Sequence, residues 1–183
     1  MMKVLFVCTG NLCRSPMAEV LLRAELRRRQ CDALEVASSG TWGMEGSPAT
    51  GEAVEAVAAL GVDLREHQAR STTVDEIRAA DLIVAMTSVH VRELTEMAPD
   101  ASGKIVLLKQ LGKTDVATLP EGSSTAERLT ALLDGRRPTS VRAHDVDDPM
   151  GMPLGTYERT VDELRDGIER LAELLCGPHA SAS

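Results

Sequence analysis

Hydrophobic residues follow two alternating patterns along this chain. Short apolar runs are typical of buried strands, whereas apolar residues that recur every three or four positions are typical of helices packed on a core. The expected strands are residues 2–7, 34–38, 81–85 and 105–108. The expected helices begin near Ser15, Thr50, Thr73 and Ser88, and the last one carries Tyr157, Val161, Leu164, Ile168, Leu171 and Leu174 on one face. The pattern therefore predicts strands that alternate with helices.

This alternation predicts an α/β fold with a four-stranded parallel sheet and helices on both faces. In such sheets ligands bind at the carboxyl ends of the strands. The segment CTGNLCRSP, residues 8–16, leaves the first strand at that edge. Ser15 is expected to cap the following helix and Pro16 to occupy its first position, where the missing N–H costs nothing. The position of this loop favours a functional role.

The length of 183 residues suits one domain, which we expect to span residues 1–177. The segment at about 109–146 does not follow the strand and helix alternation and is interpreted as an insertion. Within it, residues 125–133 place several apolar side chains on one face and predict a short helix. Residues 178–183 are small and are expected to form a disordered tail.

The charge balance limits the possible partners. The 20 Lys and Arg against 28 Asp and Glu give a net charge of −8, which disfavours a nucleic-acid-binding face or an anionic membrane surface. The apolar run at the amino end is too short for a signal peptide, and a cytoplasmic protein is expected. Oligomeric state does not follow from the sequence.

The four cysteines are too few for a disulfide scaffold and form no zinc-binding pair, so free thiols are expected. Cys31 and Cys176 lie at helix ends and are interpreted as bystanders. We expect neither a metal site nor a cofactor.

Cys8 and Arg14 are separated by five residues, Thr9, Gly10, Asn11, Leu12 and Cys13. Because this segment joins a strand to a helix N-terminus, its backbone N–H groups can surround one tetrahedral anion. Glycine permits a positive φ, and asparagine tolerates the left-handed region better than most residues. The sequence therefore predicts a phosphate-binding loop after the first strand.

A thiol at the bottom of such a loop is stabilised as the thiolate, the nucleophilic form. Cys8 could then attack phosphorus in line while the planar guanidinium of Arg14 holds two phosphoryl oxygens. The leaving oxygen needs a proton, so an acid should approach from another loop. The candidates lie in HDVDDPMG, residues 144–151.

These motifs resemble the low-molecular-weight protein tyrosine phosphatase family. The resemblance covers about residues 2–108 and 145–175 and includes VCTGNLCRSPMAE, SSGTWG, HQAR, ADLIVAMT and the Asp-Pro pair at 148–149. It implies that Cys8 is the nucleophile of a phosphocysteine intermediate and that Arg14 binds the phosphoryl group. It also implies that Asp148 is the general acid and later the base that activates water, although Asp145 and Asp147 are close alternatives.

The resemblance further assigns residues that support the loop. Asn11 would hold its strained shape, Ser15 would hydrogen-bond the thiolate, and His67 with Asp81 would form a network behind it. Ser39, in the SSGTWG segment, belongs to the same expected support. The position of Cys13 is one that in this family can form a reversible disulfide with the nucleophile.

Three residues bear on substrate choice, namely Leu12, Trp42 and Met150. In tyrosine-specific members the residue after the loop asparagine is a branched aliphatic, as Leu12 is, whereas the related protein arginine phosphatases have threonine. Met150 stands where aromatic residues often line the family's pocket. Trp42 could supply an aromatic wall instead, or could be a half-buried core residue.

Several functions remain open. The first is a phosphatase for phosphotyrosine in proteins, with phosphoarginine or a small-molecule phosphate as alternative substrates. A thiol-dependent arsenate reductase shares this fold and loop, but it needs further redox cysteines, and none lies between Asp81 and Leu175. A phosphate-binding module without turnover is disfavoured because cysteine, arginine and a distal Asp-Pro are all present.

Overall fold

The computed structural model describes residues 1–111, 122–134 and 144–177, and its centre is a four-stranded parallel sheet in the order β2-β1-β3-β4. The strands are β1 (Met2–Cys8), β2 (Leu34–Gly40), β3 (Leu82–Ala85) and β4 (Ile105–Leu107). The predicted fold class is confirmed. Because all strands run the same way, their carboxyl ends meet at one edge, where β1 ends at Cys8.

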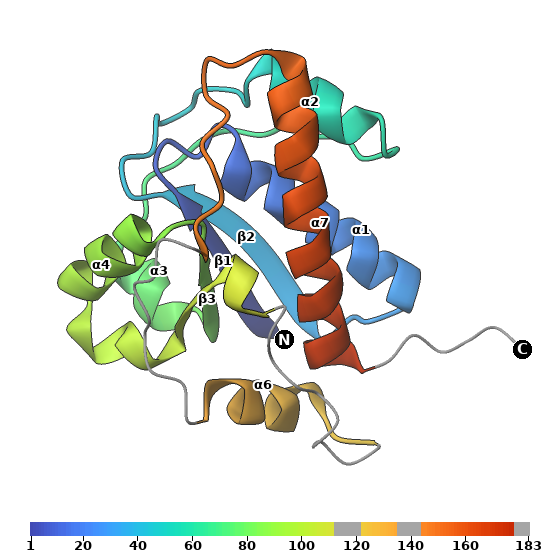
Figure 1. Ribbon diagram of the computed structural model, residues 1–183. Coiled ribbons are helices and arrows are strands. Elements are labelled where there is room, and N and C mark those ends of the chain that lie inside the picture. The colour runs from blue at the N-terminus through green and yellow to red at the C-terminus, as the bar shows by residue number, and fades with distance from the viewer. Residues whose placement is uncertain (112–121, 135–143, 178–183) are drawn as a thin grey trace, which may run out of the picture.

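Helices cover both faces of this sheet (Figure 1). The helices are α1 (Arg14–Arg29), α2 (Gly51–Ala58), α3 (Val74–Ala79), α4 (Ser88–Met97), the 3-10 helix η1 (Pro99–Lys104), α5 (Leu108–Leu111), α6 (Thr125–Leu133) and α7 (Leu154–Cys176). Alternation along β1 explains the two layers, since successive strand side chains point to opposite faces. Val4 and Phe6 pack in the core with α1, α2 and α7, whereas Leu5 and Val7 pack in the core with α3 and α4.

Most predicted elements are present, and their caps follow the sequence signals. The capping box of α3 forms between Thr73 and Glu76, and α4 and α6 span the predicted residues. The prediction that Ser15 caps α1 and that Pro16 is its first residue is wrong, because the helix begins at Arg14 and Cys13 is its N-cap, without a side-chain hydrogen bond. The Ser15 hydroxyl is instead turned toward Cys8.

The free thiols expected at Cys31 and Cys176 are also wrong, because these two residues form a disulfide. Helices α1 and α7 lie side by side in front of the sheet (Figure 1), and both begin near the loop that follows β1. Their carboxyl ends therefore meet, although 145 residues separate the two cysteines in sequence. Only Cys8 and Cys13 are free thiols.

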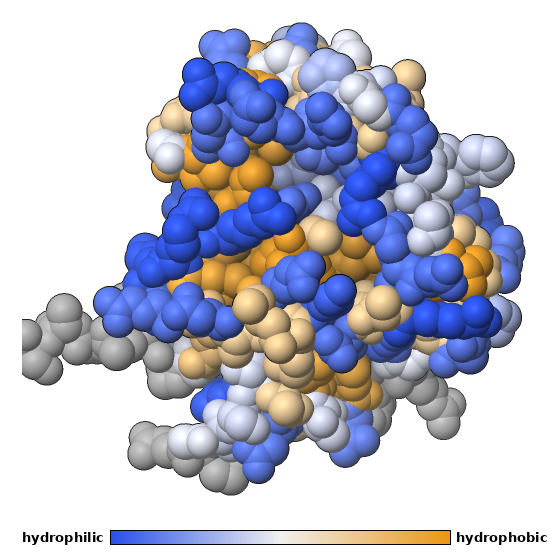
Figure 2. All heavy atoms as spheres, turned by 180° about the vertical axis from the view of Figure 1, so that it is seen from behind, coloured by the Kyte–Doolittle hydropathy of each residue, from blue (hydrophilic) through white to orange (hydrophobic). Residues whose placement is uncertain are grey.

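The opposite side of the molecule carries hydrophobic residues in the middle of the face, with hydrophilic side chains around them (Figure 2). A groove of about 260 Å³ lies between β1, β2 and α3, and Val4, Leu5 and Ala80 are among its lining residues. Among the helices that the structure describes, none combines the length and apolar character needed to cross a membrane. The tail predicted at 178–183 and parts of the predicted insertion lie outside the described residues.

Candidate active site

The loop after β1 has its left-handed turn at one residue, Asn11, with a φ of 57°. Gly10, for which a positive φ is permitted, does not adopt one. A Cβ at Gly10 would meet only the side chains of Leu12 and Met44 at ordinary contact distances. The reversal of the chain above Cys8 therefore depends on asparagine, which tolerates this backbone region because its side chain forms local hydrogen bonds.

The side chain of Asn11 is fully buried and bonded at both ends. Its Nδ2 donates to Ser15 Oγ and to Ser38 Oγ, both at 2.9 Å, and its Oδ1 accepts the backbone N–H of Arg70 at 3.0 Å. The carbonyl of Asn11 accepts from His67 Nε2 at 2.7 Å. These bonds hold the left-handed turn in one conformation.

The segment after β2 lies directly under the loop. Thr41 N donates to the Cys8 carbonyl at 2.9 Å, and Trp42 N donates to the Thr9 carbonyl at 3.0 Å. Gly40 permits this approach, because a Cβ there would lie 2.2 Å from the Thr9 carbonyl oxygen. A glycine at the end of β2 is therefore required by the phosphate-binding loop of β1.

Cys8 is buried at the end of β1, where its Sγ lies 2.9 Å from Ser15 Oγ. The same hydroxyl donates to the Ser39 carbonyl at 3.2 Å. When Cys8 is ionised, the Ser15 hydroxyl can donate to the sulfur instead, because an anion is the stronger acceptor.

Of the predicted supporting residues, His67 bonds the loop at the Asn11 carbonyl, whereas Ser39 takes a different place from that expected. Ser39 contributes its carbonyl to Ser15, while its hydroxyl pairs with Thr72 at 2.7 Å. The side chain that reaches Asn11 belongs to Ser38, which also donates to Glu19 at 2.6 Å. Sequence reasoning missed Ser38, because adjacent serines on a strand differ only in the face to which they point.

The assignment of Asp81 to the network behind the loop is wrong. Asp81 Oδ2 accepts the backbone N–H of Lys3 at 2.7 Å, at the start of β1. The five residue steps from Lys3 to Cys8 span about 17 Å of extended strand. Asp81 precedes β3 and therefore lies at the amino edge of the parallel sheet, opposite the loop.

Arg14 is the first residue of α1, and its side chain is buried, with 4% exposure for the residue. Its guanidinium donates from Nη2 to Asp148 Oδ2 at 2.7 Å and from Nη1 to the Val146 carbonyl at 3.2 Å. Nε is buried and makes no hydrogen bond with any described residue. An anion bound over Cys8 is the partner that this orientation favours.

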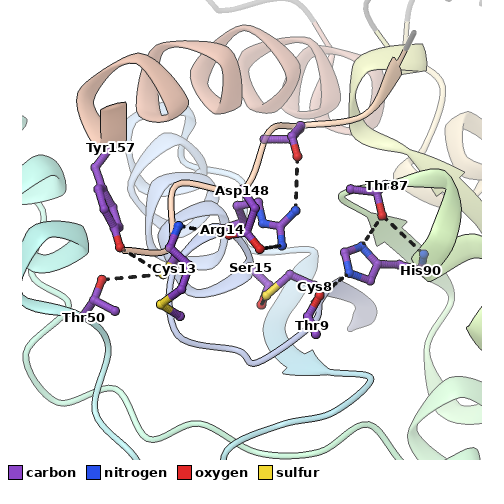
Figure 3. A network of polar contacts seen from close by, with 12 residues as sticks. Cys8, Thr9, Cys13, Arg14, Ser15, Thr50, Thr87, His90, Asp148 and Tyr157 are labelled. Carbon is purple, nitrogen blue, oxygen red and sulfur yellow. Dashed lines mark hydrogen bonds and ion pairs between the residues drawn. The ribbon is translucent and has the colours of Figure 1, made fainter. Parts of the chain in front are cut away.

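The structure separates two of the three neighbouring aspartates, Asp145 and Asp148. Asp145 accepts the backbone N–H of Ser88 at 2.6 Å and its hydroxyl at 3.1 Å, so it is occupied at the start of α4. Asp148 faces Arg14 across the loop (Figure 3) and also accepts the N–H of Met150 at 3.2 Å. Of the two, Asp148 is the carboxylate beside the phosphate-binding loop.

Cys13 is buried on the other side of the loop, with its Sγ 3.6 Å from both Thr50 Oγ1 and Tyr157 Oη. Burial is the largest cause that raises the pKa of this thiol. Burial therefore favours the neutral thiol form of Cys13.

His90 is a residue of the site that the sequence did not reveal. It lies in the first turn of α4, and its Nε2 is 2.9 Å from Thr9 Oγ1. Burial, and then the positive charge of Arg14, lower the pKa of His90 from 6.5 to about 4. A histidine inside a helix gives no signal of this kind until α4 is placed beside the loop.

The residues expected at the substrate rim differ in exposure. Leu12 is only 8% exposed and packs in the core beneath the loop, whereas Trp42 is 73% exposed and donates from Nε1 to Glu93 at 3.4 Å. The core alternative for Trp42 is therefore wrong. Met150 is exposed, as are Met44 and Met152, which makes the surroundings of the loop apolar and adaptable.

Within the described ranges, no group of three or more His, Cys, Asp or Glu residues could hold a metal ion. The groups that the structure brings together at this site are a thiol, a guanidinium and a carboxylate around one loop. Nucleophilic attack on phosphorus uses this set of groups.

Comparisons with known proteins agree with this chemistry. Residues 3–118 match the family model of the low molecular weight phosphotyrosine protein phosphatases. The low molecular weight protein-tyrosine-phosphatase Etp of Escherichia coli K12 is 41% identical over 107 residues, 58% of this chain and 69% of Etp. The protein-arginine-phosphatase of Geobacillus stearothermophilus is 34% identical over 173 residues, 94% of this chain and 95% of that protein.

A solved structure is similar along nearly the whole chain. The low molecular weight protein tyrosine phosphatase of T. tengcongensis superposes with a TM-score of 0.75 at 35% identity, over 94% of this chain and 99% of that one. The fold, the thiol at the end of β1 and the family match lead to one conclusion. This chain belongs to the low molecular weight phosphotyrosine protein phosphatase family.

Proposed function

We propose that this protein hydrolyses phosphotyrosine in proteins through a phosphocysteine intermediate on Cys8. The observation that carries the proposal is the state of Arg14, whose buried guanidinium closes the loop that begins at Cys8 and has Nε unpaired among the described residues. A buried cationic fork with a free donor is suited to phosphoryl oxygens. The family membership supports the same chemistry.

In the first step, the Cys8 thiolate attacks phosphorus and the bond from phosphorus to the leaving oxygen breaks. The phosphoryl group takes the place of Asp148 on Arg14, and the freed carboxylate takes up a proton from solvent, which it then donates to the leaving oxygen. In the second step, Asp148 accepts a proton from water, which attacks phosphorus and releases Cys8 as the thiolate. Arg14 and the loop N–H groups stabilise the charge on the equatorial oxygens in both steps.

Phosphoarginine is the second candidate substrate, and one observation favours it. The similarity to the Geobacillus stearothermophilus protein-arginine-phosphatase extends over 94% of this chain, whereas that to Etp covers 58%. Leu12 supports the tyrosine assignment, because the arginine phosphatases have threonine at the matching position. Small phosphate esters are the third candidate, because exposed methionines such as Met44 and Met150 adapt to many shapes.

The test is a set of rate measurements on phosphotyrosine, phosphoarginine and phosphoserine peptides and a panel of small phosphates. Cys8→Ser should abolish turnover while vanadate still binds, and any appreciable turnover would refute the mechanism. Asp148→Ala should lower kcat by about 100-fold or more, most strongly for poor leaving groups. Asp147→Ala is the matched control, and a larger loss in that variant would move the acid by one residue.

Substrate class is tested in the same assay with Leu12→Thr. If Leu12 selects for tyrosine, this variant should gain activity on phosphoarginine relative to phosphotyrosine. An unchanged ranking of the three peptides would remove the selectivity argument, but it would leave the Cys8 mechanism intact.

A further inference from the structure

His90 joins α4 to the phosphate-binding loop through a chain of hydrogen bonds that the mechanism above does not use. The ring is buried, with 2% exposure for the residue. Its Nε2 lies 2.9 Å from Thr9 Oγ1, and its Nδ1 lies 2.9 Å from Thr87 Oγ1 (Figure 3). Thr87 in turn is the N-cap of α4 and accepts the backbone N–H of His90 at 3.4 Å.

The surroundings of the ring keep it neutral. Burial lowers the pKa of His90 to about 4, and the charge of Arg14 acts in the same direction. The carboxylates that face the ring, Glu93 on its own helix and Asp145 and Asp148 from the segment before α7, raise the pKa by less. One ring nitrogen therefore carries a proton at neutral pH, and the other is an acceptor.

The position of that proton follows from counting donors and acceptors. Thr87 Oγ1 already accepts the backbone N–H of His90. Among the contacts of the described residues, Nδ1 of His90 is the acceptor for the hydroxyl proton of Thr87. If Thr87 donates to Nδ1, Nε2 must carry the ring proton and donate to Thr9 Oγ1. Thr9 Oγ1 is then the acceptor in its hydrogen bond with His90, and its own hydroxyl proton can be donated to another group.

We propose that His90 is a positioning residue that holds the Thr9 hydroxyl as a hydrogen-bond donor to the phosphoryl group over Cys8. This inference rests on the proposed function. Thr9 directly follows the nucleophile and is solvent-exposed, whereas His90 has no access to the substrate itself. In the opposite tautomer, Thr9 would donate to His90 and could give nothing to the substrate.

Such a donor acts on the reaction more than on binding. The phosphoryl oxygens gain partners as charge is redistributed in the transition state, so a donor held in advance costs no reorganisation. Loss of one preorganised donor lowers kcat by about 100-fold or more in other enzymes, and about 10-fold to 100-fold is expected for an exposed hydroxyl. KM and phosphate inhibition should change less than kcat.

The tautomer can be measured in the unmodified protein by ¹⁵N–¹H correlation NMR of its histidine rings at neutral pH. The His90 signals are assigned by their absence from the spectrum of His90→Phe, or of His90→Gln if the first variant does not fold. A neutral ring with its proton on Nε2 supports the proposal. A proton on Nδ1, or a doubly protonated ring, overturns it.

A double-mutant cycle tests the effect on the reaction. Thr9→Val should lower kcat on an aryl phosphate, Thr9→Ser should retain most of it, and His90→Phe should add no further loss to Thr9→Val. Thr95→Val is the matched control, because Thr95 lies on the same helix and donates only to its own helix, at Val91 O. Full kcat in Thr9→Val, or additive losses in the double variant, would overturn the proposal.

The two levels of inference fail in different ways. If the wild-type protein hydrolyses none of the phosphate substrates, the proposed function fails, and the NMR measurement still decides the proton position. If the wild type is active, Cys8→Ser is inactive and Thr9→Val equals the wild type, only the role of His90 is refuted.

Discussion

The disulfide between Cys31 and Cys176 offers the sharpest test of how this fold is stabilised. It joins the residue after the α1 C-cap to the last residue of α7, two helices that pack along each other. The perturbation is the Cys31→Ser/Cys176→Ser double variant, compared with the wild type in the presence and absence of a reductant. Neither cysteine lies near the loop, so chemistry at Cys8 should be unaffected.

The magnitude follows from the length of chain that the disulfide closes. For a sequence separation of 145 residues, the loss of loop-closure entropy in the unfolded chain corresponds to about 5 kcal/mol. Measured disulfides typically contribute about 2–4 kcal/mol, since the unfolded state retains structure. We therefore expect the free energy of unfolding to fall by about 2–5 kcal/mol and the melting temperature by roughly 4–20 °C.

The assay is guanidinium unfolding of the wild type and the double variant, each with and without reductant. Reductant should shift the wild-type midpoint to that of the double variant and leave the double variant unchanged. Thiol titration of the unfolded protein is a second check, because the disulfide takes two of the four cysteines and leaves Cys8 and Cys13. Four reactive thiols without reductant, or equal midpoints in all samples, would refute the reasoning.

The same thiol titration tests whether the Cys31–Cys176 disulfide forms in the cellular compartment that holds the protein. The sequence predicts a cytoplasmic protein, and most cytosolic compartments keep thiols reduced. A protein isolated from its own cells under thiol-blocking conditions should show whether the two helix ends are bonded there. This outcome does not depend on the catalytic mechanism.

Three further predictions concern acid stability and the phosphate-binding loop. The pKa of His90 is about 4 in the folded protein and 6.5 in the unfolded chain, so the neutral ring stabilises the fold fully above pH 6.5, and up to about 3 kcal/mol of the free energy of unfolding should be lost as pH falls to 4. In urea titrations at a series of pH values, His90→Gln should weaken this pH dependence of the free energy of unfolding. The same pH dependence in the variant and the wild type would contradict the prediction. In Gly40→Ala the new Cβ would lie 2.2 Å from the Thr9 carbonyl oxygen, so the free energy of unfolding should fall by about 1–3 kcal/mol and most of the activity should be lost. Gly51→Ala, with open space around the new Cβ, should change neither the stability nor the activity. Asn11→Gly keeps the positive φ but loses the side-chain hydrogen bonds, so its melting temperature and kcat should both fall; values equal to the wild type would show that the backbone conformation alone matters.

Local sequence signals determined the order of the elements and the position of the loop. The apolar runs predicted the strands, the capping box at Thr73 marked the start of α3, and the start of α4 was predicted at Ser88. The loop was predictable because its residues are contiguous and lie between a strand and a helix. Signals of this kind act over a few residues, which is the range on which backbone preferences and periodicity depend.

Contacts between segments that are distant in the sequence could not be predicted from these local signals. Ser38, Gly40 and His90 meet the loop from β2 and α4, and nothing in their own neighbourhoods marks them. The disulfide was missed for the same reason, since two isolated cysteines give no pairing signal until two helices lie side by side. Asp81 shows the converse, because a residue placed by family resemblance lies at the opposite edge of the sheet here.

The sequence by itself predicted the chemistry of this protein, because a thiol and a guanidinium with five residues between them, on a loop that joins a strand to a helix, are suited to binding and attacking a phosphoryl group. Only the tertiary structure decided which groups surround that chemistry. Parallel strand pairing brings β2 and α4 to the loop, and packing of α7 on α1 brings Asp148 to Arg14. The physical reason is that the loop is built from local backbone geometry, whereas its partners are selected by burial of the core.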